Sequence, residues 1–208
     1  MIRYPLLLLA IAVLLGGCTT LRETEPGQTA RHQLLLSTAA DEASQRISPN
    51  LPAGTSVFVN TDHFGSSDDY QSSYAIGAIR AAILKQGYNL AASADEADTI
   101  AEVSSGALSI DRRERLLGVP SASVPIPLAG PFKTPEISFW KSKERTGVAK
   151  FRLTFYDAET GALQDASDPV YGFSHFDRSS ILFFGSTDSN LMPPEVEERR
   201  ESNAGTQD

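Results

Sequence analysis

The chain has 208 residues, with 18 lysines and arginines, 26 aspartates and glutamates, and a formal net charge of −8. This acidic balance argues against nucleic acid or anionic lipid as a partner bound by overall charge, because phosphate binding requires clustered basic residues. The single cysteine excludes an internal disulfide. The stability of the folded part must therefore come from a packed core, for which a chain of this length suffices.

The N-terminus has the residue pattern of an export signal. Arg3 is followed by an apolar run of ten residues, 6–15 (LLLLAIAVLL), which is too short to cross a bilayer of about 30 Å, since that needs roughly 20 apolar residues. We therefore expect a secretory leader and no transmembrane anchor. Two glycines then precede Cys18, and the stretch LGGC at 15–18 resembles the lipobox of bacterial lipoproteins.

The lipobox resemblance implies a covalent membrane anchor. The leader, residues 1–17, is then cleaved, and fatty acyl chains such as palmitate are attached to Cys18; several chains are needed because a single one binds a membrane only marginally. Thr19, rather than aspartate, follows the cysteine, which in this family implies the periplasmic face of the outer membrane rather than the inner membrane. The alternative is an ordinary leader followed by an incidental or buried cysteine.

The remainder of the chain is expected to form one domain between two polar segments. Residues 18–31 contain the lipidated cysteine and a polar tether with Pro26 and Gly27. A single periplasmic α+β domain covers 32–190. The charged segment 191–208 lacks apolar periodicity, and we expect it to be a disordered tail.

Apolar periodicity predicts two helices and several strands within the domain. Helical spacing indicates helices at 33–47 and from Asp68 or Asp69 to 86. Alternation and short apolar runs indicate strands at 55–62, 88–92, 98–111, 148–156, around 163 and at 170–176. The predicted fold class is α+β: a mixed, mainly antiparallel sheet with two helices packed on one face, plus a proline-rich apolar loop.

Four glycines have predicted structural roles. Gly87 is expected to end the second helix, Gly106 to mark a bulge in the strand 98–111, and Gly161 to turn the chain after the strand 148–156. Glycine inside a helix costs about 1 kcal/mol relative to alanine. We therefore expect Gly77, within the second helix, to pack closely on the sheet.

Several short motifs resemble known envelope lipoproteins. The stretch 97–106 (ADTIAEVSSG), the stretch 156–163 (YDAETGAL) and Gly172 resemble small periplasmic lipoproteins of the curli-secretion, penicillin-binding-protein activator and TolB N-terminal type. The resemblance covers roughly 55–176 and implies the fold rather than an activity. The chain lacks the alternating hydrophobic hairpins of the curli channel, so the pore function is not carried over.

A second resemblance is to an uncharacterised proteobacterial lipoprotein family. It rests on the blocks GALSIDR at 106–112, VPIPLAGP at 124–131 and TGVAK at 146–150, together with YDAETGAL. This resemblance implies no known reaction.

The sequence contains no recognisable catalytic apparatus. There are three histidines without an HExxH pattern, no GxSxG motif, no glycine-rich phosphate loop and no cysteine left for thiol chemistry. We therefore expect no enzyme activity, no cofactor and no resident metal. The best polar cluster is a candidate ligand edge after the first strand, at Asp62, His63, Asp68 and Asp69. Capping and turn formation also explain these residues.

The stretch 116–140 is dense in prolines and too apolar for a solvated linker. We expect a loop that packs on its own domain, on another protein or against lipid headgroups. A second apolar run, 181–184 (ILFF), raises the same question, and the two would form one exposed patch if they are neighbours. The candidate interface residues are Pro125, Ile126, Pro127, Leu128, Phe132, Trp140, Phe183 and Phe184.

Three arginines, Arg112, Arg113 and Arg115, precede this stretch. We expect them to form a solvated strand end. Glu114 lies among them, which weakens the alternative of a phosphate site.

The function favoured by the sequence is that of a lipid-anchored, non-catalytic binding or accessory subunit of a bacterial envelope complex serving assembly, transport or secretion. Its partners would be the membrane, through the N-terminal lipid, and an envelope protein or further copies of itself, with no nucleic acid. One alternative is a small-ligand or metal-binding protein that uses the edge at Asp62 and His63. Another is a monomeric spacer in the envelope.

Overall fold

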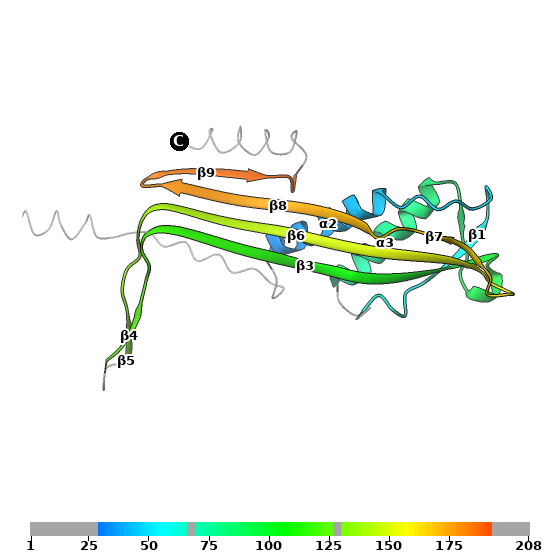
Figure 1. The fold of residues 1–208 in the computed structure, drawn as a ribbon, viewed down its shortest axis with the longest axis horizontal. Helices are drawn as coiled ribbons and strands as arrows, with labels where there is room; N and C mark the ends of the chain where they lie inside the picture. The colour runs from blue at the N-terminus through cyan, green and yellow to red at the C-terminus, as the bar shows by residue number, and fades with distance from the viewer. Residues whose placement is uncertain (1–28, 66–69, 127–129, 193–208) are drawn as a thin grey trace, which may run out of the picture. The chain divides into compact units, whose positions relative to one another are not determined.

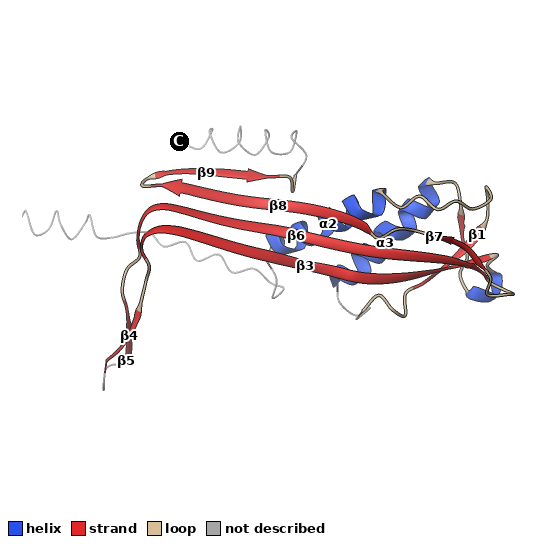
Figure 2. Cartoon of the chain, viewed as in Figure 1, coloured by secondary structure: helices blue, strands red, loops and turns tan. Residues whose placement is uncertain are grey.

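The computed structural model describes residues 29–65, 70–126 and 130–192 (Figure 1). Cys18, the leader, nearly all of the tether and nearly all of the tail lie outside these residues. The described residues from Arg31 onward belong to one compact unit. Its helices and strands, shown in Figure 2, are α2 (Ala30–Gln45), β1 (Ser56–Asn60), α3 (Tyr70–Lys85), β2 (Asn89–Leu90), the short 3₁₀ helix η1 (Ala94–Glu96), β3 (Thr99–Val119), β4 (Ser123–Ile126), β5 (Gly130–Lys133), β6 (Ile137–Asp157), β7 (Leu163–Ala166), β8 (Val170–Ile181) and β9 (Phe184–Ser189).

The main sheet has seven strands. Six follow the order β2-β1-β3-β6-β8-β9, and β7 pairs with β6 beside this path. β1 runs parallel to both β2 and β3, whereas the other neighbours in this sheet are antiparallel. The predicted α+β class, with a mixed and mainly antiparallel sheet, is confirmed.

The two helices bury the apolar faces that their spacing predicts. In α2 and just beyond it, Leu36, Ala40, Ala43 and Ile47 are buried. In α3, the buried side chains include Ile76, Ile79 and Ile83, which recur at i, i+3 and i+7. These side chains belong to the same buried core or line it, so both helices pack on one face of the sheet. We call this the helix face of the sheet, and the opposite side the open face.

The core is formed by alternate residues of the central strands. Side chains two positions apart point to the same face of a strand, and here one set is fully buried while the other is partly or largely exposed. The buried set on β1, β3 and β6 is Val57, Val59, Ala101, Val103, Ala149, Phe151, Leu153 and Phe155. Among the described residues, every buried apolar residue lies between Leu35 and Leu191.

Helix α2 approaches the sheet very closely at two glycines. A Cβ atom on Gly172 of β8 would overlap the Ala39 carbonyl oxygen and the Ala43 nitrogen, and a Cβ on Gly147 of β6 would overlap the Leu35 carbonyl oxygen. The Ser174 hydroxyl also donates to the Leu35 carbonyl, at 2.5 Å. These two glycines therefore set how near the helix lies to the sheet.

Strands β3 and β6 are longer than predicted. Each has 21 residues and would extend about 70 Å. The predicted strands, 98–111 and 148–156, cover only the part whose alternation buries apolar side chains. Beyond it, the antiparallel register continues through charged and polar pairs such as Arg113 with Glu144. The prediction that Arg112, Arg113 and Arg115 form a strand end is therefore wrong, although all three are exposed.

The predicted proline-rich loop is also wrong in large part. Residues 116–119 belong to β3 and 137–140 to β6, and between them β4 and β5 form a separate two-stranded hairpin. Pro125 pairs with Pro131 in this hairpin. Both strands of an isolated hairpin are edge strands, where a residue without an N–H is tolerated. Pro120, which directly follows β3, lies outside the strands.

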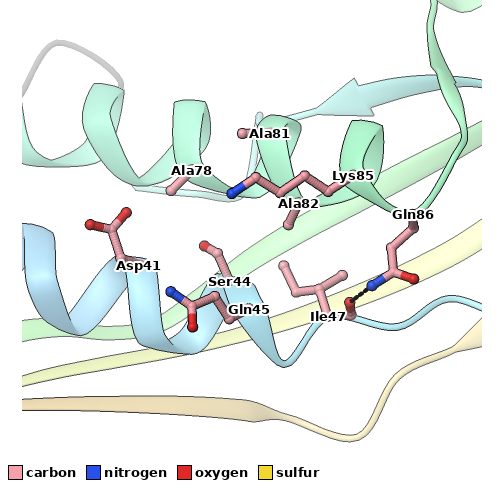
Figure 3. Close-up of a pocket in the computed structure, with 9 residues that line it drawn as sticks. All are labelled: Asp41, Ser44, Gln45, Ile47, Ala78, Ala81, Ala82, Lys85 and Gln86. Atoms are coloured by element: carbon pink, nitrogen blue, oxygen red, sulfur yellow. Dashed lines mark hydrogen bonds between the residues drawn. The ribbon is translucent and has the colours of Figure 1, made fainter.

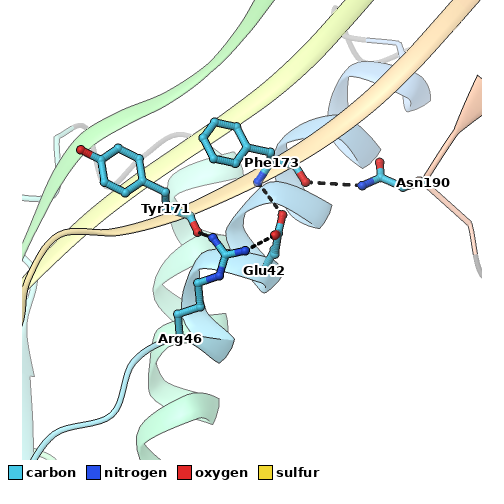
Figure 4. Close-up of polar contacts among 5 residues, drawn as sticks. All are labelled: Glu42, Arg46, Tyr171, Phe173 and Asn190. Atoms are coloured by element: carbon cyan, nitrogen blue, oxygen red, sulfur yellow. Dashed lines mark hydrogen bonds and ion pairs between the residues drawn. The ribbon is translucent and has the colours of Figure 1, made fainter.

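The outer edge of β8 is blocked by side chains from other elements (Figure 4). The Phe173 N–H donates to the Glu42 carboxylate at 2.6 Å, and the Arg46 guanidinium, paired with Glu42, donates to the Tyr171 carbonyl. Asn190 accepts from the His175 N–H at 2.7 Å and donates to the Phe173 carbonyl. These bonds satisfy backbone groups that an uncovered edge strand would expose.

Predictions for individual glycines and for the tail have different outcomes. Gly87 and Gly161 have φ of 89° and 69°, and the β3–β6 register shifts at Gly106, as predicted. Gly77 is exposed, and a Cβ there would meet no atom within 4 Å, so its predicted close packing on the sheet is wrong. Leu191, assigned to the tail, is buried and belongs to the domain.

We predict that Gly172→Ala lowers the free energy of unfolding by about 1–3 kcal/mol, because the added methyl group overlaps backbone atoms of α2. Gly77→Ala is the matched control and should raise it by up to about 1 kcal/mol, since alanine is the better helix former. Urea denaturation followed by circular dichroism measures both. Equal stability of Gly172→Ala and the wild type would contradict the close approach of α2 to the sheet.

Candidate interaction surfaces on the distal half of the sheet

The distal half of the sheet begins beyond Gly147 and Ser174, which both lie against the Leu35 carbonyl of α2. It comprises the residues 110–119 of β3, 137–146 of β6, 175–181 of β8 and all of β9. In β3, every residue from Asp111 to Val119 is exposed except the half-buried Leu116. This half therefore presents both faces to its surroundings.

The end of the distal half is an exposed apolar surface, which we call the apolar tip. Register places Leu117, Trp140, Ile181 and Phe184 side by side across β3, β6, β8 and β9. Trp140 is half-buried. The other apolar side chains here are each more than half exposed: Leu117, Val119, Ile137, Phe139, Ile181, Leu182, Phe183 and Phe184.

The two-residue turn between β8 and β9 has an unusual backbone conformation. Ile181 pairs with Phe184, so Leu182 and Phe183 form the turn, and Leu182 has a φ of 52°. Glycine is the usual residue where the first turn position has a positive φ, and another residue there costs about 1–3 kcal/mol. The Leu182 N–H donates to the Phe139 carbonyl at 3.0 Å, which ties the turn to β6. Phe183 is 96% exposed and Phe184 82%.

The structure joins the two apolar stretches that the sequence left separate. Trp140 of the first stretch pairs with Ile181 of the second, so the condition for one exposed patch is met. Phe132, in the β4–β5 hairpin, is also more than half exposed. Of the other candidate interface residues, Pro125 and Ile126 lie in β4, whereas Pro127 and Leu128 lie outside the described residues.

The helix face of the distal half gathers four arginines, which we call the arginine cluster: Arg31, Arg112, Arg145 and Arg178. Arg112 and Arg145 are direct cross-strand partners, and Phe176 is the next residue in the same row. The guanidinium carbon of Arg31 lies 4.0 Å from the centre of the Phe176 ring, and that of Arg178 lies 5.9 Å from it. Four segments distant in sequence thus contribute one basic surface.

The electrostatic consequences appear in two titrating groups of α2. Burial, then Arg178 and Arg145, lower the pKa of Arg31. Burial, then Arg112, Arg145 and Arg31, lower the pKa of His32. His32 Nε2 lies 3.1 Å from Arg112 Nη2. The arginine cluster is therefore a region of positive potential within an acidic chain.

The open face at the same level has a different charge pattern. Glu144 pairs with Arg115 at 2.9 Å and with Arg113 at 3.9 Å. Asp177 is the next residue across from Glu144, and its Oδ1 is buried without a hydrogen-bond partner among the described residues. Asp188 follows in the same row and lies 3.5 Å from His175. Because side chains alternate between the two faces of a strand, Arg112 lies on the helix face, whereas Arg113 and Arg115 lie on the open face.

The candidate ligand edge is only partly described. Asp62 and His63 are exposed in the loop after β1, and the Asp62 N–H donates to Asn60 Oδ1 at 2.9 Å. Asp68 and Asp69 lie outside the described residues. Within 29–65, 70–126 and 130–192, no group of three or more histidine, cysteine, aspartate or glutamate residues is placed to hold a metal ion. The small-ligand or metal-binding alternative stays a prediction.

A small cavity that sequence analysis did not foresee lies between α2 and α3 (Figure 3). Its volume is about 180 Å³, and its lining includes Asp41, Ser44, Lys85 and Gln86. Small alanine side chains on α3 leave this gap. Ser44 Oγ, which has no hydrogen-bond partner among the described residues, borders it. Water filling such a polar gap would pair this hydroxyl.

Comparison with known proteins places the chain in a family. The model of a family of unknown function (DUF6655) matches residues 10–172, which is most of the chain. The chain belongs to DUF6655. The DUF6655 match includes Cys18 and three of the four clustered arginines, but it ends before Arg178 and the turn at Leu182. No curated protein matches the chain. In its described part, this DUF6655 member has no helix long and apolar enough to span a membrane.

We predict that His32 makes the stability of the domain depend on pH. Because the folded pKa of His32 is lowered, the unfolded chain, with a histidine pKa of about 6.5, binds this proton more readily. Stability from this group is thus present above pH 6.5 and is lost as the pH falls below it. The urea midpoint should therefore drop less between pH 7 and pH 5 in His32→Gln than in the wild type.

A second variant tests the cause of the lowered pKa. Arg145→Gln removes one of the cations that disfavour the protonated imidazole. The pKa of His32, measured by NMR titration, should rise in this variant. Identical titration curves in the variant and the wild type would contradict the electrostatic assignment.

Proposed function

We propose that this protein is a lipid-anchored protein of the bacterial envelope that works by binding, as a non-catalytic accessory subunit of an envelope complex, and that the apolar tip contacts its partner. The observation that carries the proposal is the exposed turn at the end of the sheet, with Phe183 and Phe184 almost fully exposed. Large contiguous apolar patches on a water-soluble domain are typical of interaction sites.

The position of the turn supports binding rather than accidental exposure. Leu182 holds a positive φ, which the β8–β9 pairing and the bond to Phe139 maintain. Such strain costs stability, and strained residues are concentrated at functional sites. Aromatic side chains frequently dominate interfaces, and a turn whose backbone is already held in place loses little backbone entropy on binding.

The composition of the apolar tip is that of a surface that binds a protein, rather than of one that stays exposed to water. The tip side chains project from the ends of paired strands, so the surface is formed before binding. Its residues are apolar and aromatic, with charged pairs such as Lys141 with Glu114 and Glu136 nearby. An apolar centre with a polar rim is the usual composition of a protein interface. A second copy of the chain would fit the same description.

The proposed membrane attachment rests on the sequence around Cys18. A short apolar leader and small residues precede this cysteine. The described residues from Leu35 to Leu191 form a packed core, which is compatible with a folded body held by a tether. The tether would place the domain on the periplasmic side of the outer membrane, within reach of other envelope proteins.

We predict that labelled palmitate is incorporated into the full-length protein in its native type of cell and that Cys18→Ala abolishes the labelling, because Cys18 has the only thiol. The protein should fractionate with membranes, and the variant should not carry lipid. Wild-type protein without label, or with its leader removed at another position, would overturn the membrane attachment.

We also predict that a photo-reactive phenylalanine analogue at position 183 crosslinks to a partner protein in cells. The matched control is the same analogue at position 84, on α3, where the native leucine is also exposed. Leu182→Gly should raise the free energy of unfolding by about 1 kcal/mol through relief of strain, and it should lower the crosslinking yield by loosening the turn. Mass spectrometry of the adducts measures the yield.

The identity of the adduct tests the proposal further. A discrete partner protein supports the accessory role, and a crosslink between two copies supports self-association through the tip. Equal yields at positions 183 and 84, or adducts with lipid alone, would contradict a protein-binding tip.

A further inference from the structure

We propose that the arginine cluster binds the phosphate groups of anionic lipids at the surface of the membrane that carries the protein. The inference rests on the proposed lipid anchor for its choice of phosphate source. Its geometric basis is independent of the apolar tip: it lies on the helix face of the sheet, next to the N-terminal end of α2.

The first argument is the direct pairing of like charges. Arg112 and Arg145 are opposite each other in the antiparallel register of β3 and β6, where side chains are about 5 Å apart at Cβ and like charges are destabilising. Arg178 adds a third guanidinium one row further toward the tip, beside Lys143. The chain has a net charge of −8, yet it places these arginines side by side, where like charges destabilise the pairing of two strands. Such locally unfavourable arrangements are expected at functional sites.

The second argument is the absence of internal counter-ions. Among the described residues, no carboxylate lies within 4.0 Å of the guanidinium groups of Arg31, Arg112, Arg145 or Arg178. Other cations of the distal half do have such partners: Arg113 and Arg115 have Glu144, and Lys141 and Lys143 have Glu114. Glu114 interacts electrostatically with Arg145, but its direct ion pairs are with Lys141 and Lys143. Among the described residues, the four arginines of the cluster therefore form no direct ion pair with a carboxylate.

The third argument is the chemistry of the groups and how they are held. Guanidinium groups bind phosphate oxygens with paired N–H donors. Arg31 lies over the Phe176 ring, and Arg178 lies near the same ring, and such contacts fix a guanidinium plane without using its donors. The ring thus holds Arg31 in place before any anion arrives, and Arg178 lies at the outer limit of the same kind of contact.

The position of the proposed lipid anchor in the sequence favours membrane lipids as the source of the phosphate groups. Arg31 is 13 residues after Cys18, because 31 − 18 = 13, so the intervening chain can extend at most about 45 Å. Arg31 is also among the first residues of the compact unit. A basic patch close to a lipid anchor adds to membrane affinity, with each basic residue near an anionic surface contributing about fivefold.

The test uses the chain from Thr19 onward, which lacks the leader and Cys18 but retains all the residues that the structure describes, including every described core residue. Sedimentation with vesicles of phosphatidylcholine containing 30% phosphatidylglycerol should show binding well above that to phosphatidylcholine alone. Arg145→Gln with Arg178→Gln should weaken this binding about 25-fold, for two lost charges. Arg80→Gln with Arg152→Gln, at exposed arginines elsewhere on the domain, is the charge-matched control and should bind as the wild type does.

Four outcomes of the binding measurements would overturn the inference. The first is equal binding of the cluster variant and the wild type, and the second is an equal loss in the control variant. The third is stabilisation of the wild type by inorganic phosphate in a thermal melt without any binding to anionic vesicles, which would assign the cluster to a soluble phosphate compound. A chain from 19 to 192, lacking the acidic tail, should bind the vesicles at least as tightly as the longer chain. Loss of binding on removing the tail would also count against the cluster.

Stability measurements separate binding from a structural role. If the cluster is kept for an external anion, Arg145→Gln should raise the urea midpoint at low salt, because it removes an uncompensated like-charge pair. A fall in the midpoint would indicate a structural arginine instead. If palmitate is not incorporated but the protein still binds the vesicles, the lipid anchor is refuted and phosphate binding by the arginine cluster is supported. If palmitate is incorporated but the protein does not bind the vesicles, only phosphate binding by the cluster is refuted.

Discussion

The antiparallel pairing of β3 with β6 is the interaction on which the rest of the structure depends. It extends almost from end to end of both strands, from Thr99 with Asp157 to Val119 with Ile137. Among the described residues, helices cover the half nearest β1 and β2 (Figure 1). There, burial of apolar side chains accompanies the backbone hydrogen bonds. In the distal half the same hydrogen bonds continue while most residues of β3 are exposed, and β8 and β9 extend the sheet laterally.

The distal half of the sheet has three distinct surfaces. Because side chains alternate along a strand, the distal half has a helix face and an open face with separate sets of charges. Arg112 faces Arg145 on the helix face, whereas Arg113 and Arg115 meet Glu144 on the open face. The ends of the strands form the third surface, the apolar tip. The covered half thus supplies the stability that lets the distal half expose groups suited to binding.

The predicted fold class and helices depended on local signals that the tertiary structure preserved. The helical stripe ending at Ile47, the bulge at Gly106 and the turn at Gly161 are each set by residues close together in the chain. The strand lengths were missed because apolar alternation ends where the helices stop covering the sheet. The prolines of 116–140 led to a loop prediction, although Pro125 and Pro131 are tolerated in an isolated hairpin.

The sequence by itself determined the class of the fold, the candidate anchor at Cys18 and the two apolar stretches that contribute to the tip. These features depend on residue type and short spacing. Tertiary structure alone decided that Trp140 lies beside Ile181 and that Arg112 lies beside Arg145. The physical reason is register: which residues face each other across strands depends on hydrogen-bond pairing between distant segments, and a shift by one residue would send each side chain to the opposite face.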